Sequence, residues 1–151
     1  MYIAVDPGKT VGVATFREDG TDIARKALDI DKFRTLLKSF YFGVKDSDEK
    51  LRFIVEDYKL RQDMALAQTG SDMPASKCIG AIEMIMTLLG EQSMIWWQRP
   101  SDLKGALKWA GYPELARKPR TWHCPDDLSA YAHGVHRLID LGVRKHPIFG
   151  N

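Results

Sequence analysis

Short runs and alternations of apolar residues predict five β-strands along the chain. Residues 1–6 and 10–16 are rich in Val, Ile, Ala and Phe, and the turn sequence DPGK between them indicates a hairpin. Residues 21–28 follow an Asp-Gly turn and suit a third strand, although their pattern is also compatible with a helix. Apolar runs at 51–56 and 93–97 predict two further buried strands.

Apolar residues at helical spacing alternate with these strands and predict four helices, over 31–42, over 75–89, over 100–110 and from Pro125 to about Leu141. Strands that alternate with helices are typical of an α/β fold with a mixed five-stranded sheet flanked by helices. The length of 151 residues is usual for one compact domain, so we expect a single domain over 1–151.

Charge changes this picture only locally. The formal net charge of +2 is mildly basic and does not by itself indicate a nucleic-acid partner. Basic residues nevertheless outnumber acids after Arg99, which predicts a basic surface over one part of the fold.

The two cysteines, Cys78 and Cys124, lack CxxC spacing, which argues against a zinc site or a disulfide framework. Together with the lack of a leader or a membrane-spanning run, this predicts a cytoplasmic protein with no membrane partner.

Acidic residues stand at the points where predicted elements end or begin. Asp6 ends the first strand, Glu56 ends the strand at 51–56, and Asp126 and Asp127 open the last helix. If the first and fourth strands are neighbours, Asp6 and Glu56 share one edge of the sheet, and the last helix can bring a third carboxylate there. Gathered carboxylates repel one another unless a cation lies among them. Their oxygens suit Mg²⁺ or Mn²⁺, and two such ions about 3.5–4 Å apart would promote phosphodiester hydrolysis.

Each of these acids also has a purely structural interpretation. Asp before Pro-Gly commonly opens a turn, and Glu56 could form the polar edge of a loop. Acids after Pro125 suit a helix N-terminus because they favour the helix dipole. The combination of all three positions, in this order of strands and helix, favours a metal site over three separate local roles.

Three segments resemble one known family. IAVDPGKTVGVATF (3–16) resembles the first strand pair of RuvC-type Holliday junction resolvases, FIVEDY (53–58) their second acidic strand, and HCPDDLSAYAHGVHRL (123–138) their last helix. These enzymes belong to the RNase H-like, or retroviral integrase, superfamily, and the compact length is similar to bacteriophage forms. The resemblance covers nearly the whole chain but is weak outside these motifs.

The resemblance implies a Mg²⁺-dependent crossover junction endodeoxyribonuclease with two ions per active site, for which Mn²⁺ can substitute. Asp6 and Glu56 would be metal ligands and catalytic residues. In the last motif His123 and Asp126 have His-x-x-Asp spacing, which favours Asp126 as ligand, with His123 binding a metal or assisting the attacking water. Asp127 is the alternative if the helix shifts by one residue. The sequence departs from the family's other pattern, an earlier Asp at the position of Cys124 or His123, so the fourth ligand stays open.

The resemblance also implies a homodimer that binds four-way DNA junctions, and the helix at 75–89 could be its interface or plain core. Basic and aromatic residues near the acids are predicted to contact DNA: Lys9, Tyr58, Lys59, Arg61, Lys104, Lys108, Arg117, Lys118 and Arg120. The tryptophans Trp96, Trp97, Trp109 and Trp122 are predicted mainly as core, with Trp122 also a possible stacking residue beside His123.

Other functions compete with this interpretation. An RNase H-like nuclease of broader specificity for branched DNA or other nucleic acids would carry the same acids. DPGKT partly matches the phosphate loop of the actin and sugar-kinase ATPases, but their two lobes need a longer chain. A catalytically inactive binding module is disfavoured because all three acidic positions are filled.

Overall fold

The protein is described here from a computed structural model, which covers residues 1–57, 73–119 and 121–146. Five strands form one mixed sheet in the order β3-β2-β1-β4-β5. They are β1 (Tyr2–Asp6), β2 (Val11–Phe16), β3 (Asp22–Leu28), β4 (Leu51–Glu56) and β5 (Ser93–Gln98). β2 is antiparallel to both of its neighbours, β1 and β3, whereas β4 runs parallel to both β1 and β5. The segment at 21–28, for which a helix was an alternative, is therefore a strand.

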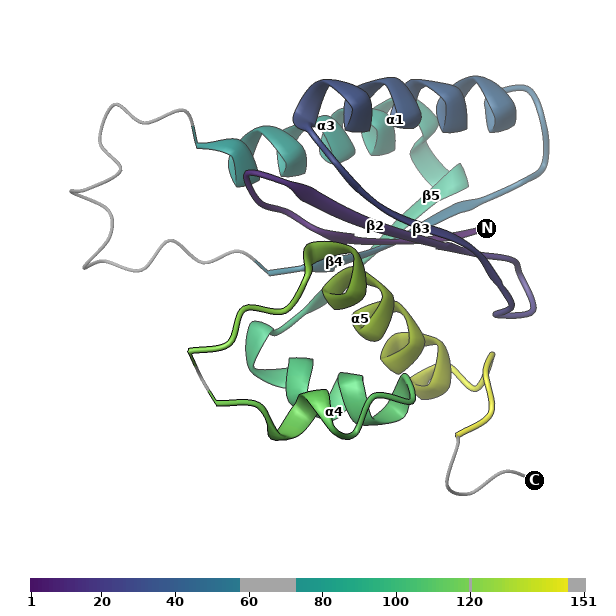
Figure 1. Ribbon diagram of the computed structural model, residues 1–151. Helices are drawn as coiled ribbons and strands as arrows, with labels where there is room; N and C mark the ends of the chain where they lie inside the picture. Colours follow the sequence, from purple (N-terminus) through teal and green to yellow (C-terminus); the bar gives the residue numbers. More distant parts are fainter. Residues whose placement is uncertain (58–72, 120, 147–151) are drawn as a thin grey trace.

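Helices cover both faces of this sheet (Figure 1). α1 (Ile30–Val44) and α3 (Pro74–Leu89) lie on one face, and α4 (Leu103–Trp109) and α5 (Asp126–Asp140) lie on the other. Short 3₁₀ turns occupy Gly90–Gln92, Pro100–Asp102 and Leu115–Arg117. The mixed five-stranded sheet flanked by helices is the architecture that the sequence predicts. No helix in the described part of the chain is long and apolar enough to cross a membrane.

Alternate residues of the central strands build two separate apolar layers, because successive side chains of a strand point to opposite faces. Ile3 and Val5 of β1 pack with α1 and α3, in a cluster that includes Phe33 and Ile82. The opposite face of the sheet packs against α5. This second cluster contains Tyr2, Ala4, Ala14, Phe16 and Ile54 of the sheet and Ala130, Val135 and Leu138 of α5. Because both faces are covered, β1 and β4 are apolar at nearly every position until each ends in an acid.

The edge strand β5 corrects one sequence prediction. Trp97 is 42% exposed and is not a core residue, whereas Trp96, Trp109 and Trp122 are half-buried. β5 has a neighbour on one side only, and a side chain on an edge strand is less completely covered than one at the centre of the sheet.

Helix α5 approaches the sheet closely because Gly134 has no side chain. A Cβ at Gly134 would lie 2.5 Å from Cε2 of Phe16 and 2.9 Å from Cβ of Ala4, and both neighbours are fully buried. Neither can move away without disturbing the layer beneath α5.

Gly134→Ala is therefore expected to destabilise the protein. The overlap costs about 1–3 kcal/mol and outweighs the gain of about 1 kcal/mol that alanine brings to a helix interior. The matched control is Gly80→Ala in α3, where a Cβ meets nothing within 4 Å. In urea unfolding, Gly80→Ala should raise the free energy of unfolding by about 0.5–1 kcal/mol. Equal effects of the two substitutions would contradict this packing.

Candidate functional site

Asp6 and Glu56 stand at the carboxyl ends of two neighbouring parallel strands. Val5 of β1 lies opposite Val55 of β4, so the next residue of each strand emerges at the same edge of the sheet. The side chain of Glu56 is only 18% exposed, and Asp6 is also partly buried. The structure thus places these two predicted site residues together.

The start of α5 brings a third acid to this edge. Gly12 pairs with Asp6 across the β1–β2 ladder. A Cβ at Gly12 would lie 1.9 Å from the carbonyl oxygen of Asp126 and 2.3 Å from its carbonyl carbon. Only a glycine therefore allows the first turn of α5 to rest on β2 directly beside Asp6.

The burial of Asp6 and its closeness to other acids change its pKa. The pKa of Asp6 is raised from its ordinary 3.8 to about 6, chiefly by burial, then by the negative charge of Glu56 and, to a smaller extent, that of Asp126. Ser129 and His133 act in the opposite direction. The same acids affect the thiol of Cys124. Its pKa is raised to about 12, first by burial and then by the charges of Asp6, Asp127, Asp126 and Glu56.

Two residues of α5 that the sequence interpretation did not include surround Glu56. The hydroxyl of Ser129 donates a hydrogen bond of 3.3 Å to Oε2 of Glu56. Nε2 of His133 lies 3.4 Å from the same oxygen, and this imidazole is only 1% exposed. Neither of its nitrogens makes a hydrogen bond within the described residues. Ser129 follows Asp126 by three residues and His133 follows Ser129 by four, so all three lie on one face of a helix. This spacing is visible in the sequence and could have identified Ser129 and His133.

Asp127 and His123 have different surroundings. Oδ2 of Asp127 lies 3.5 Å from Nε of Arg25 on β3, so this carboxylate has a cationic partner. His123 is 87% exposed, and its Nε2 lies 3.3 Å from Oδ1 of Asp126. Of the two adjacent acids, Asp126 is therefore the one that both shifts the pKa of Asp6 and contacts His123.

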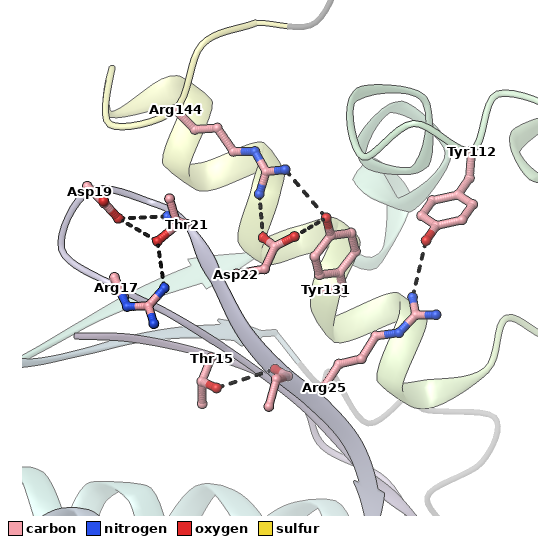
Figure 2. A network of polar contacts seen from close by, with 10 residues as sticks. Thr15, Arg17, Asp19, Thr21, Asp22, Arg25, Tyr112, Tyr131 and Arg144 are labelled. Carbon is pink, nitrogen blue, oxygen red and sulfur yellow. Dashed lines mark hydrogen bonds and ion pairs between the residues drawn. The ribbon is translucent and has the colours of Figure 1, made fainter.

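A polar network on β3 holds Arg25 and fastens α5 to the sheet (Figure 2). The guanidinium of Arg25 donates to the Tyr112 hydroxyl at 3.4 Å and lies over the ring of Tyr131, 5.7 Å from its centroid. On the same strand, Asp22 accepts hydrogen bonds from the Tyr131 hydroxyl at 3.0 Å and from Arg144 at 2.6 Å. These contacts join β3 to Tyr131 within α5, the helix that carries Asp126, and to Arg144 in the segment that follows the helix.

The basic residues of the predicted set that the structure describes are all exposed. Lys9 occupies the turn between β1 and β2, and Lys104 and Lys108 lie on α4. Arg117 and Lys118 follow on the connection to α5, where Lys104 Nζ donates to the Lys118 carbonyl at 3.4 Å. The other predicted DNA contacts, Tyr58, Lys59, Arg61 and Arg120, lie outside the described residues.

The acids have the chemistry of a divalent-metal site. Within residues 1–57, 73–119 and 121–146, no three His, Cys, Asp or Glu side chains are arranged to hold a metal ion. The donor set nevertheless fits Mg²⁺, which prefers carboxylate oxygens, and a bound cation would offset both the burial and the repulsion from Glu56 that raise the pKa of Asp6. The metal ligands thus stay a prediction.

Comparisons with known proteins identify the fold. No protein-family model matches the chain, and no curated protein matches it. Among solved structures, the chain is similar to T. thermophilus RuvC in complex with a Holliday junction substrate. The identity is 12%, the match covers 94% of this chain and 96% of that chain, and the TM-score is 0.56. The fold is thus RNase H-like, as the sequence predicts.

The raised pKa of Asp6 predicts a stability that depends on pH in metal-free buffer. Between pH 4 and pH 6 the folded protein holds a proton on Asp6 that the unfolded chain releases, so the free energy of unfolding falls as the pH rises through this range. The contribution of Asp6 amounts to about 3 kcal/mol. The free energy of unfolding of Asp6→Asn minus that of the wild type should therefore be larger at pH 7.5 than at pH 4 by about this amount. Urea unfolding in the presence of EDTA measures both values.

Other carboxyl groups titrate in the same range, so the comparison needs a matched control. Asp46→Asn removes a carboxylate that is 82% exposed in a turn. Its stability difference from wild type should change little with pH. A pH-independent difference between Asp6→Asn and wild type would show that Asp6 is not desolvated as described.

Proposed function

We propose that this protein is a Mg²⁺-dependent, structure-selective endodeoxyribonuclease that cleaves four-way DNA junctions. The observation that carries the proposal is the gathering of Asp6, Glu56 and Asp126 where two parallel strands meet the start of α5. The similarity in fold to RuvC, whose structure contains a Holliday junction, supports this choice over other phosphodiester substrates.

In this proposal, residues of the chain hold and orient the reacting groups. Asp6, Glu56 and Asp126 would hold Mg²⁺, or Mn²⁺ in its place, and the bound ions would supply a water of lowered pKa and neutralise the leaving oxygen. Ser129 would orient Glu56 through the hydrogen bond to its Oε2, and His133 lies beside the same oxygen. His123, exposed beside Asp126, would accept a proton from water. Asp127 is the alternative ligand, although its contact with Arg25 favours a structural role.

The proposed substrate is bound through its phosphates. Lys9, Lys104, Lys108, Arg117 and Lys118 would neutralise the DNA backbone on either side of the acids. Two symmetric cuts in one junction require two active sites, so we include a two-fold homodimer in the proposal. The outer face of α3 supports it, because Met84 and Leu88 there are 61% and 58% exposed.

The test is cleavage of a synthetic four-way junction beside duplex, single-stranded and flap DNA, with Mg²⁺, Mn²⁺ or EDTA. The wild-type protein should make paired, symmetric nicks in the junction, and only with metal. Asp6→Asn should lower the cleavage rate by more than about 100-fold because it removes a ligand, yet bind the junction as wild type does. Electrophoretic mobility shift measures the binding.

Asp46→Asn, far from the acids, is the control and should keep full activity. Equal cleavage of junction and flap DNA would favour the broader RNase H-like nuclease over a junction resolvase. A fully active Asp6→Asn protein, or wild-type protein that cuts no substrate with metal present, would contradict the proposal.

A further inference from the structure

The apolar interior of a groove beside the acids has no part in the function proposed so far. It has a volume of about 550 Å³ and lies where α4 and the connection to α5 come together. Most of its wall is apolar, formed by Leu103, Leu107, Leu115, Pro119, Trp122 and Cys124. This volume and composition are within the range of sites that take up small organic groups.

The rim of the groove is positively charged. Lys104 and Lys118 line it, and none of the described lining residues is acidic. The hydrogen bond from Lys104 Nζ to the Lys118 carbonyl, 3.4 Å long, holds one ammonium group over the connection to α5. An apolar interior that contains one indole ring, below a rim with two lysines, complements a flat heterocycle that carries a phosphate.

The groove ends close to the carboxylates. Cys124 lines it and is two residues before Asp126, and the charges of Asp6, Asp126, Asp127 and Glu56 all act on its thiol. Trp122 is the neighbour of His123, which contacts Asp126. A nucleotide bound in the groove would therefore lie one or a few positions along the strand from a phosphate at the acids.

We propose that this groove binds an unpaired nucleobase of the DNA strand that is cut, stacked on Trp122, with Lys104 and Lys118 on the adjoining phosphates. This inference rests on the proposed function and deepens it. A structure-selective enzyme needs a means to distinguish branched from duplex DNA, and a base can enter such a groove only where it has left its pair.

Junctions with single abasic residues test this proposal. Each nucleotide near the cleavage position is replaced in turn, and binding is measured by fluorescence anisotropy with Mg²⁺ in the Asp6→Asn background. At one position the abasic residue should weaken binding by about tenfold, the typical worth of one base stacked on an aromatic ring. Adding Trp122→Leu keeps an apolar side chain but removes the ring. It should weaken binding of the intact junction by the same factor as the abasic residue does, and in this variant the abasic residue should cause no further loss of binding.

Two variants and one probe control the result. Trp122→Phe keeps an aromatic face and should retain most of the abasic effect, and Trp97→Ala, at an exposed indole outside the groove, should retain all of it. Lys104→Gln and Lys118→Gln should weaken binding of intact and abasic junctions alike. Should Trp122→Leu fail to fold, 2-aminopurine at the sensitive position should still lose fluorescence when the Asp6→Asn protein with native Trp122 binds.

The outcomes separate this inference from the proposed function. The nucleobase groove would be overturned if the losses in binding caused by Trp122→Leu and by an abasic residue simply added at every position, or if the fluorescence of 2-aminopurine did not fall on binding. Cleavage of the unmodified junction by the wild-type protein would still uphold the nuclease. Failure of the wild-type protein to bind or cut any branched DNA would overturn both.

Discussion

The backbone contact between Gly12 and Asp126 is the constraint on which the site depends. Because a side chain at Gly12 would overlap the carbonyl group of Asp126, a glycine there is what lets the first turn of α5 rest on β2. Gly12 pairs with Asp6, and β1 pairs with β4, so the same contact fixes Asp126 relative to both strand-end acids. Gly134, further along α5, allows a second close approach, to Phe16 and Ala4. Two glycines on different elements therefore set how α5 lies on the sheet.

The gathered acids oppose folding, and the apolar layers on both faces of the sheet hold them together. Desolvation and the charge of Glu56 raise the pKa of Asp6, which means that ionised Asp6 destabilises the folded state when no cation is bound. β1 and β4 are buried between α1 and α3 on one face and α5 on the other, so their ends cannot separate to relieve this repulsion. A site of this kind is destabilised without its ligand and stabilised by any divalent cation that it binds.

Sequence patterns could predict the sheet and the strand-end acids because both depend on local signals. β1 and β4 have apolar runs, interrupted in β4 only by Arg52, that end in Asp6 and Glu56, and Pro125 precedes the two acids that open α5. The surroundings of these acids depend on contacts between distant elements. The ion pair of Asp127 with Arg25 requires β3 to lie beside α5, and the approach of His133 to Glu56 requires one face of α5 to turn towards β4. The exposure of Trp97 follows from the place of β5 at the sheet edge, which its own apolar sequence does not indicate.

In the proposed function, α5 brings Asp126, rather than Asp127, to Asp6 and Glu56, and the three carboxylates would hold a divalent metal ion. Titration of Mn²⁺, followed by electron paramagnetic resonance, tests this most directly in the wild type, Asp126→Asn and Asp127→Asn. The wild type should bind Mn²⁺ that Mg²⁺ displaces, Asp126→Asn should lose at least about tenfold in affinity, and Asp127→Asn should bind nearly as the wild type does. A wild type that binds no Mn²⁺, or a larger loss in Asp127→Asn than in Asp126→Asn, would contradict the account.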